Sequence, residues 1–247
     1  MSFLGGIFGG DQPNKKNIDK LVARVKEAYA QPEYRREAME KLLAWNTPES
    51  IAGVLNRFTV VVQSPHWDEE EKRWLVDELA ELGAPARQAL QRFLAKAEHI
   101  AFAAKALQRL GEKEQYLADL IAALKARAPD DHRTVQGKCE LVACLADTED
   151  PRVIESLLPY LDDHGDDVQC GVVDALGRLW PKAGEATAPA LAQLQLAIGD
   201  DTRSARVLRH AAAAMNRLQL PIDATRSLAP AVAEDFVVRD GKLAPAH

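Results

Sequence analysis

Cysteines, aromatic residues and long apolar runs are all scarce in this sequence of 247 residues, and each scarcity argues against a class of protein. The three cysteines, Cys139, Cys144 and Cys170, are odd in number and form no CxxC pair. A disulfide framework is therefore disfavoured and a reducing compartment is expected. No run approaches the roughly 18 apolar residues that a membrane-spanning helix needs. The first ten residues lack the basic segment and cleavage site of a secretory signal, so we expect a cytoplasmic protein.

A basic excess is also missing, because 31 Lys and Arg residues face 37 Asp and Glu residues and the net charge is −6. Proteins that bind phosphate backbones usually carry a basic excess, so a nucleic-acid partner is disfavoured. The charge is uneven along the chain: residues 1–130 are neutral overall, and residues 131–247 carry the whole −6. The acidic excess is concentrated between Asp147 and Asp167.

Apolar residues recur at three- and four-residue intervals from about residue 15 onward, which predicts an all-α chain with no strand before the C-terminal tail. The stripe is clearest at Val168, Val172, Leu176 and Leu179. We expect Leu157, Leu176 and Leu179 to be buried between neighbouring helical pairs. Large aromatic wedges are typical of the junctions in a helical stack, and we assign this role to Trp45, Trp67, Trp74 and Trp180.

The helices end in similar leucine-containing segments that recur along the chain. The last leucines of these segments are Leu82, Leu110, Leu145, Leu179 and Leu218, separated by 28, 35, 34 and 39 residues. A drifting period of this length is typical of stacked helical pairs. We place the pairs at residues 33–62, 68–96, 99–127, 132–162, 166–198 and 203–230, preceded by a lead helix over residues 18–29.

The segment CLADTEDPRVIESLL at residues 144–158, with Asp166-Asp167-Val168 and DALGRL at 174–179, resembles bacterial HEAT repeats, including the phycobilin-lyase type. The resemblance is good over residues 130–218 and looser over 33–127. It implies a right-handed α-solenoid of about six HEAT-like hairpins. The sequence departs from the family at Gln169, where an arginine is usual, so we expect the arginine ladder between repeats to be broken there.

The resemblance divides the chain into three parts. Residues 1–17 form an apolar, glycine-rich N-terminal tail, residues 18–230 form the solenoid, and residues 231–247 form a C-terminal tail. In the C-terminal tail Asp240-Gly241 is a hairpin signal.

The extended surface of such a stack, together with the lack of catalytic motifs, predicts a non-enzymatic adaptor or scaffold that binds another protein. We expect no catalytic residue, no cofactor and no metal, and we interpret the Asp-Asp-His strings at 130–132 and 162–164 as loop and capping residues. The second helix of each pair would line the binding surface. The candidate partner-binding residues are Gln91, Arg92, Asp119, Glu155 and Gln193, together with Arg203, Arg206 and Arg209, which we place on one helix as a basic patch.

Two enzyme-related alternatives and a second binding site stay open. The resemblance implies a bilin-lyase-like or chaperone role on a tetrapyrrole protein. The basic patch is the best argument for a HEAT-like DNA glycosylase, which would need an acidic catalytic residue beside it. The N-terminal tail carries an apolar face interrupted by glycines, and it is a candidate for docking to a partner or to a membrane surface. That face consists of Phe3, Leu4, Ile7 and Phe8. The identity of the partner and the oligomeric state are not predicted.

Overall fold

A computed structural model describes residues 12–223 and 225–246, apart from the side chains of residues 185 and 186. It confirms that the chain is predominantly α-helical. The chain divides into two compact units, residues 1–116 and residues 117–247, and the boundary falls inside a helix.

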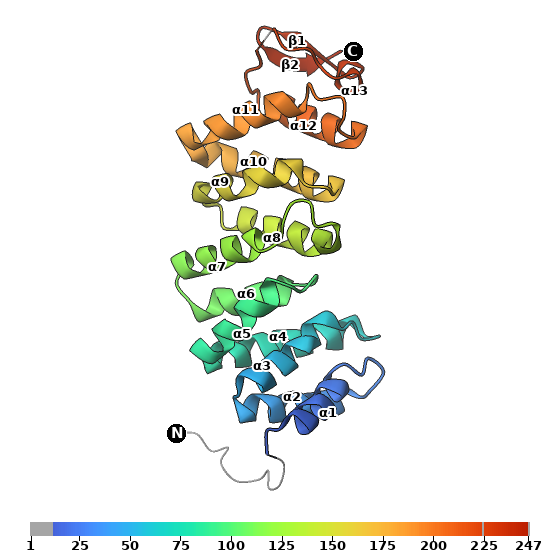
Figure 1. Cartoon of the computed structure of the whole chain (residues 1–247), viewed down its shortest axis with the longest axis vertical. Helices are drawn as coiled ribbons and strands as arrows, with labels where there is room; N and C mark the ends of the chain where they lie inside the picture. Colours follow the sequence, from blue (N-terminus) through green and yellow to red (C-terminus); the bar gives the residue numbers. More distant parts are fainter. Residues whose placement is uncertain (1–11, 224, 247) are drawn as a thin grey trace. The chain divides into compact units, whose positions relative to one another are not determined.

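In the first unit, three helices begin at a proline and the first helix follows the capping side chain of Asn14. Its elements are α1 Lys15–Val25, α2 Pro32–Trp45, α3 Pro48–Val54, the 3-10 helix η1 Leu55–Thr59, α4 Pro65–Leu82, α5 Ala84–Leu94 and α6 Ala101–Leu110, and α7 Lys113–Lys125 continues into the second unit. Helix α4 packs against both α2 and α6, while α3 packs against α5 (Figure 1). In these contacts a helix packs against the next helix but one along the chain.

The lead helix differs from the prediction, because α1 covers residues 15–25 and Tyr29 lies outside it with 78 % of its surface exposed. The cause is a tertiary contact. The guanidinium Nη1 of Arg35 donates to the carbonyl oxygens of Glu27 at 3.2 Å and Ala30 at 2.5 Å, which holds this segment as a turn.

The second unit repeats the same packing pattern. Its elements are η2 His132–Thr134, α8 Val135–Asp147, η3 Pro151–Val153, α9 Ile154–Leu157, η4 Leu158–Asp162, α10 Asp166–Ala183, η5 Gly184–Thr187, α11 Ala188–Ala197, α12 Ala205–Arg217, α13 Pro230–Ala233, β1 Phe236–Arg239 and β2 Lys242–Pro245. Helix α10 packs against α8 and α12, and α9 packs against α11 (Figure 1). Leu157, Leu176 and Leu179 are 0 % exposed, as predicted.

The prediction of a sixth helical pair over residues 203–230 is wrong. Among the described residues of the second unit, no long helix follows α12 as the second member of such a pair. Pro221 has no N–H to continue a helix, and it forms an isolated bridge with Lys242. The Ile222 N–H donates to the Gly241 carbonyl oxygen at 2.8 Å. This segment therefore pairs with the C-terminal hairpin instead of folding into a helix.

The C-terminal hairpin joins β1 and β2 in antiparallel register, with Val238 opposite Leu243 and Arg239 opposite Lys242. Asp240 and Gly241, at φ 51° and 71°, form the turn. Positive φ at both central residues matches the right-handed twist of the strands. The hairpin packs against α12 through β2.

The tryptophans only partly occupy the core positions predicted for them. Trp45, Trp74 and Trp180 are half-buried. Trp67, in the first turn of α4, is 45 % exposed, so its assignment to the core is wrong. Its neighbour in space is the His66 ring, at a centroid distance of 5.4 Å.

Candidate functional site

Two hollows of about 300 and 280 Å³ lie in the first unit, between α3 with its 3-10 extension and α5. The larger hollow has an apolar lining that includes Ala52, Leu55, Ala89 and Phe93. The smaller hollow has a more polar rim with Asn46 and Gln88. Ala89 and Arg92 line both hollows, so the two form adjacent parts of one surface. We name this surface, defined by the residues above together with Lys96, the α3/α5 site.

Local sequence explains why this space is open. Thr47 starts α3 with a capping box, in which its Oγ1 accepts from the Ser50 N–H at 3.1 Å and its own N–H donates to Ser50 Oγ at 3.0 Å. Alanine occupies the facing positions 52 and 89, and such short side chains leave room between the helices. The Phe93 ring is held at the edge by Phe58, at a centroid distance of 6.3 Å.

The α3/α5 site is basic. Arg92 and Lys96 line the larger hollow, and none of the described residues that line either hollow is acidic. Helix α5 itself contains no Asp or Glu. Within the described chain, Arg92 and Lys96 form no ion pair or hydrogen bond through their side chains. Their charges are therefore available to a ligand.

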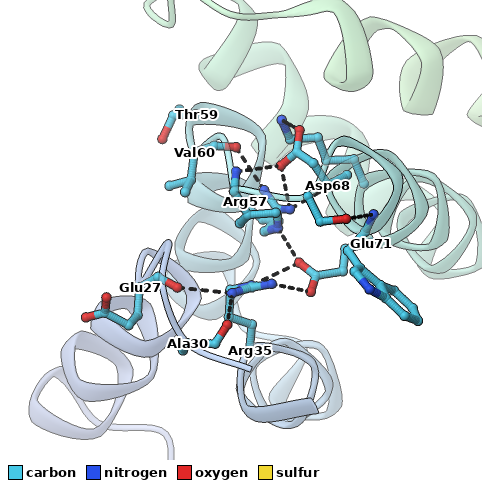
Figure 2. A network of polar contacts seen from close by, with 12 residues as sticks. Glu27, Ala30, Arg35, Arg57, Thr59, Val60, Asp68 and Glu71 are labelled. Carbon is cyan, nitrogen blue, oxygen red and sulfur yellow. Dashed lines mark hydrogen bonds and ion pairs between the residues drawn. The ribbon is translucent and has the colours of Figure 1, made fainter. Parts of the chain in front are cut away.

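A buried network of charges holds the framework beside this site (Figure 2). The Glu71 carboxylate accepts from Arg35 Nη2 at 2.8 Å and from Arg57 Nε at 2.7 Å. Arg57 also donates to Asp68 Oδ1 at 2.8 Å and to the Val60 carbonyl oxygen at 2.9 Å. Since Arg57 belongs to η1, which directly follows α3, the network ties this part of the site to α4.

Each charge in this network has a partner, as buried charges require. Arg35, Arg57 and Glu71 are between 0 and 5 % exposed. Burial alone would raise the pKa of Asp68, but bonds from Lys72 and Arg57 outweigh burial and lower it. Asp68 therefore stays ionised, and we assign the network a structural role: it fixes the turn before α2 and the segment that follows η1.

The second unit contains a similar device at the loop before α8. Lys138 is 0 % exposed, and its Nζ lies 2.6 Å from Asp163 Oδ2. The same Nζ donates to the carbonyl oxygens of Ala128, Pro129 and Asp131 at 3.1 to 3.2 Å. In each unit, a buried cation close to the start of a helix thus holds the loop before that helix.

Tyr160 binds the neighbouring segment of the second unit, at the end of α7. Its hydroxyl donates toward the carbonyl oxygens of Leu124 at 2.6 Å and Arg127 at 2.9 Å. Burial, with a smaller contribution from Asp163, raises its pKa to about 12. The hydroxyl is therefore a protonated hydrogen-bond donor and not a catalytic base at neutral pH.

The basic patch predicted on one helix is corrected in two respects. Arg203 lies before α12, because Ser204 caps that helix with its Oγ, which accepts from the Val207 N–H at 3.3 Å. All three arginines are also engaged by acids: Arg203 by Asp162, Arg206 by Asp167 at 2.6 Å, and Arg209 by Asp235 at 2.9 Å. These pairs join α12 to neighbouring segments of the second unit and partly neutralise its charge.

At Gln169, where the resemblance predicts a break in an arginine ladder, the glutamine itself contacts an arginine. Gln169 Oε1 accepts from Arg203 Nη1 at 3.1 Å, and Gln169 Nε2 donates to the Asp163 carbonyl oxygen at 2.6 Å. Arg203 Nη1 also donates to the Leu161 carbonyl oxygen at 2.7 Å. The arginine that makes this contact comes from the segment before α12.

The structure does not gather the other candidate partner-binding residues at one site. Gln91 is exposed on α5 beside Arg92, but it does not line the hollows. Asp119 is half-buried on α7, Glu155 is exposed on α9 and Gln193 is half-buried on α11, all in the second unit. Sequence reasoning missed Lys96, although the absence of acids from residues 84–96 was a usable signal. The tail residues Phe3, Leu4, Ile7 and Phe8 lie outside the described residues.

The chemistry-bearing side chains elsewhere form no further site in the part of the chain that is described. No group of three or more metal-ligating side chains occurs among those residues. Burial raises the pKa of the Cys139 and Cys170 thiols, which disfavours the reactive thiolate form. No helix in the same residues combines the length and apolar character needed to cross a membrane.

Comparisons with protein-family models, with curated proteins and with solved structures return no match to this chain.

Proposed function

We propose that this chain is an α-solenoid of HEAT-like hairpins that acts as a non-enzymatic adaptor and binds a protein partner at the α3/α5 site. The single observation that carries the proposal is the pair of hollows, which combine an apolar lining with the unpaired Arg92. A concave apolar surface with a few convergent polar groups is the usual form of a binding site.

The repeat architecture is supported by polar contacts whose sequence separation matches the period of the leucine segments. Arg35 and Glu71 are 36 residues apart in the first unit. In the second unit the separations are 34 for Arg203 and Gln169, 36 for His210 and Asp174, and 38 for Ser204 and Asp166. Contacts between equivalent positions of successive hairpins are what a stacked repeat produces.

A site-specific photocrosslink tests the adaptor function. We would replace Gln88, which is exposed and lines the smaller hollow, with a photoreactive phenylalanine analogue and irradiate the full-length chain in extract of its source cell. The expected result is one defined protein adduct that excess unlabelled wild-type chain competes away.

The matched control carries the same photoreactive residue at Glu70, an exposed position of α4 in the same unit. The Glu70 variant should not give the adduct. Equal adducts at both positions, or none at Gln88, would contradict the proposal, and an adduct with DNA would favour the glycosylase alternative.

A further inference from the structure

We infer that the α3/α5 site takes an acidic peptide segment, with one large apolar side chain in the larger hollow and flanking carboxylates on Arg92 and Lys96. This inference depends on the proposed adaptor function and specifies the chemistry of the partner.

The larger hollow provides the apolar half of this recognition. Its floor contains Leu55 and Ala89, which are 1 % and 6 % exposed, and the Phe93 ring forms part of its wall. A volume of about 300 Å³ lies at the small end of the range for ligand pockets. It therefore suits a single leucine or aromatic side chain better than a cofactor.

Arg92 and Lys96 provide the charged half. The two residues are four positions apart at the C-terminal end of α5, and both line the larger hollow. The end of the helix favours cations, so these charges are held there without a carboxylate from the chain. A guanidinium can bind a carboxylate through two parallel hydrogen bonds, and an ammonium can add a point charge beside it.

Arg92 differs from other arginines of this chain in having no carboxylate partner within the described residues. Arg203, Arg206 and Arg209 are each bonded to a carboxylate of the same chain, and so are Arg35 and Arg57. Arg92 forms no such pair within the described residues and borders both hollows. A carboxylate is therefore the group that would complement the positive charge of the α3/α5 site.

The smaller hollow explains why an extended peptide fits better than an isolated carboxylate ligand. Asn46 and Gln88 line it and carry amide groups that can donate to and accept from a peptide backbone. Arg92 lines both the polar and the apolar hollow. A peptide that crosses both hollows can therefore make apolar contacts, hydrogen bonds to the amide groups and an ion pair with Arg92.

The test begins with a random peptide library displayed on phage, selected on the immobilised full-length chain. The expected winners carry one large apolar residue flanked by Asp or Glu. A fluorescently labelled winner is then titrated against the wild type and two variants. The double variant Arg92→Glu/Lys96→Glu should weaken binding by roughly tenfold or more, because attraction becomes repulsion. Ala52→Phe should weaken it similarly by filling the hollow without changing the charge.

Two controls separate this effect from a general change in charge or folding. Lys20→Glu and Arg239→Glu reverse exposed charges that form no ion pair in the described chain, and together they change the net charge by the same amount. This control should bind within about twofold of the wild type, because neither residue lines a hollow and salt screens exposed charges. All variants should retain the wild-type circular dichroism and thermal midpoint, since the substituted side chains are exposed.

The outcomes distinguish the inference from the function on which it depends. The inference fails if the winners lack acidic residues, if no peptide is enriched, or if the double variant binds an acidic winner as well as the wild type. It also fails if the double variant abolishes self-association in sedimentation, since the occupant would then be a second copy. If the Gln88 adduct still forms in any of these cases, the adaptor function stands and only the acidic-peptide inference is lost.

Discussion

At the scale of single residues, Glu71 is the point at which the buried charges of the first unit meet. It accepts bonds from both Arg35 and Arg57, and its side chain is 6 % exposed. Replacing it by the neutral isostere, Glu71→Gln, should lower the free energy of unfolding by about 3–5 kcal/mol, because two guanidinium groups lose their shared countercharge. Urea denaturation measures this change.

The matched control is Glu70→Gln, one residue away, where the side chain is 57 % exposed and faces His66. This variant should stay within about 0.5 kcal/mol of the wild type. Equal losses in the two variants would show that the network contributes nothing beyond an ordinary surface pair.

Tyr160 gives a prediction about pH. Its pKa is raised to about 12 from an ordinary value of 10.0, chiefly by burial. The folded state therefore keeps this proton longer than the unfolded state does. The resulting stabilisation is complete below pH 10 and is lost as the pH rises toward 12. A near-ultraviolet titration of tyrosinate, taken as wild type minus Tyr160→Phe, should show a group with a midpoint near 12.

The control for this titration is the same difference measured in denaturant, where the midpoint should return to about 10. A midpoint near 10 in the folded protein would contradict the buried hydrogen bonds assigned to Tyr160.

At the scale of elements, two glycines in the second unit should respond oppositely to alanine. Gly171 lies inside α10, and a Cβ added there would meet Val142 at 3.9 Å, an ordinary contact. Gly171→Ala should therefore stabilise the chain by about 0.5–1 kcal/mol. Gly241 has φ 71° at the hairpin turn, so Gly241→Ala should destabilise it by about 1–2 kcal/mol.

Chemical denaturation of the two variants provides the measurement, and each serves as a control for the other. A loss of stability in Gly171→Ala would mean that α8 and α10 pack more tightly there than the distance indicates. No loss in Gly241→Ala would mean that the hairpin contributes little to the stability of the second unit.

At the scale of the whole molecule, the proposed α-solenoid predicts an elongated particle. A compact globule of 247 residues would have a radius of gyration of about 18 Å. Small-angle X-ray scattering of the monomer, with the mass checked by light scattering, should give a clearly larger value. A radius near 18 Å would contradict the solenoid.

The sequence alone was sufficient to predict that the chain is mainly helical and that the clearest apolar stripe is buried. The spacing of Val168, Val172, Leu176 and Leu179 indicated one face of a helix, and all four side chains are 0 % exposed. Such predictions succeed because helix periodicity is a local property and burial follows it. The Asp240-Gly241 turn is equally local, because its backbone conformation depends on the residues that form it.

Only the tertiary structure decided where helices stop and which charges remain free. Tyr29 lies outside α1 because Arg35 binds the carbonyl oxygens of Glu27 and Ala30. Residues 221 and 222 pair with the C-terminal hairpin instead of forming a helix. Arg92 was predicted as a binding residue, but its setting between the two hollows depends on alanines from two separate helices. Spacing along one helix does not report contacts with another helix, because these depend on how the helices pack.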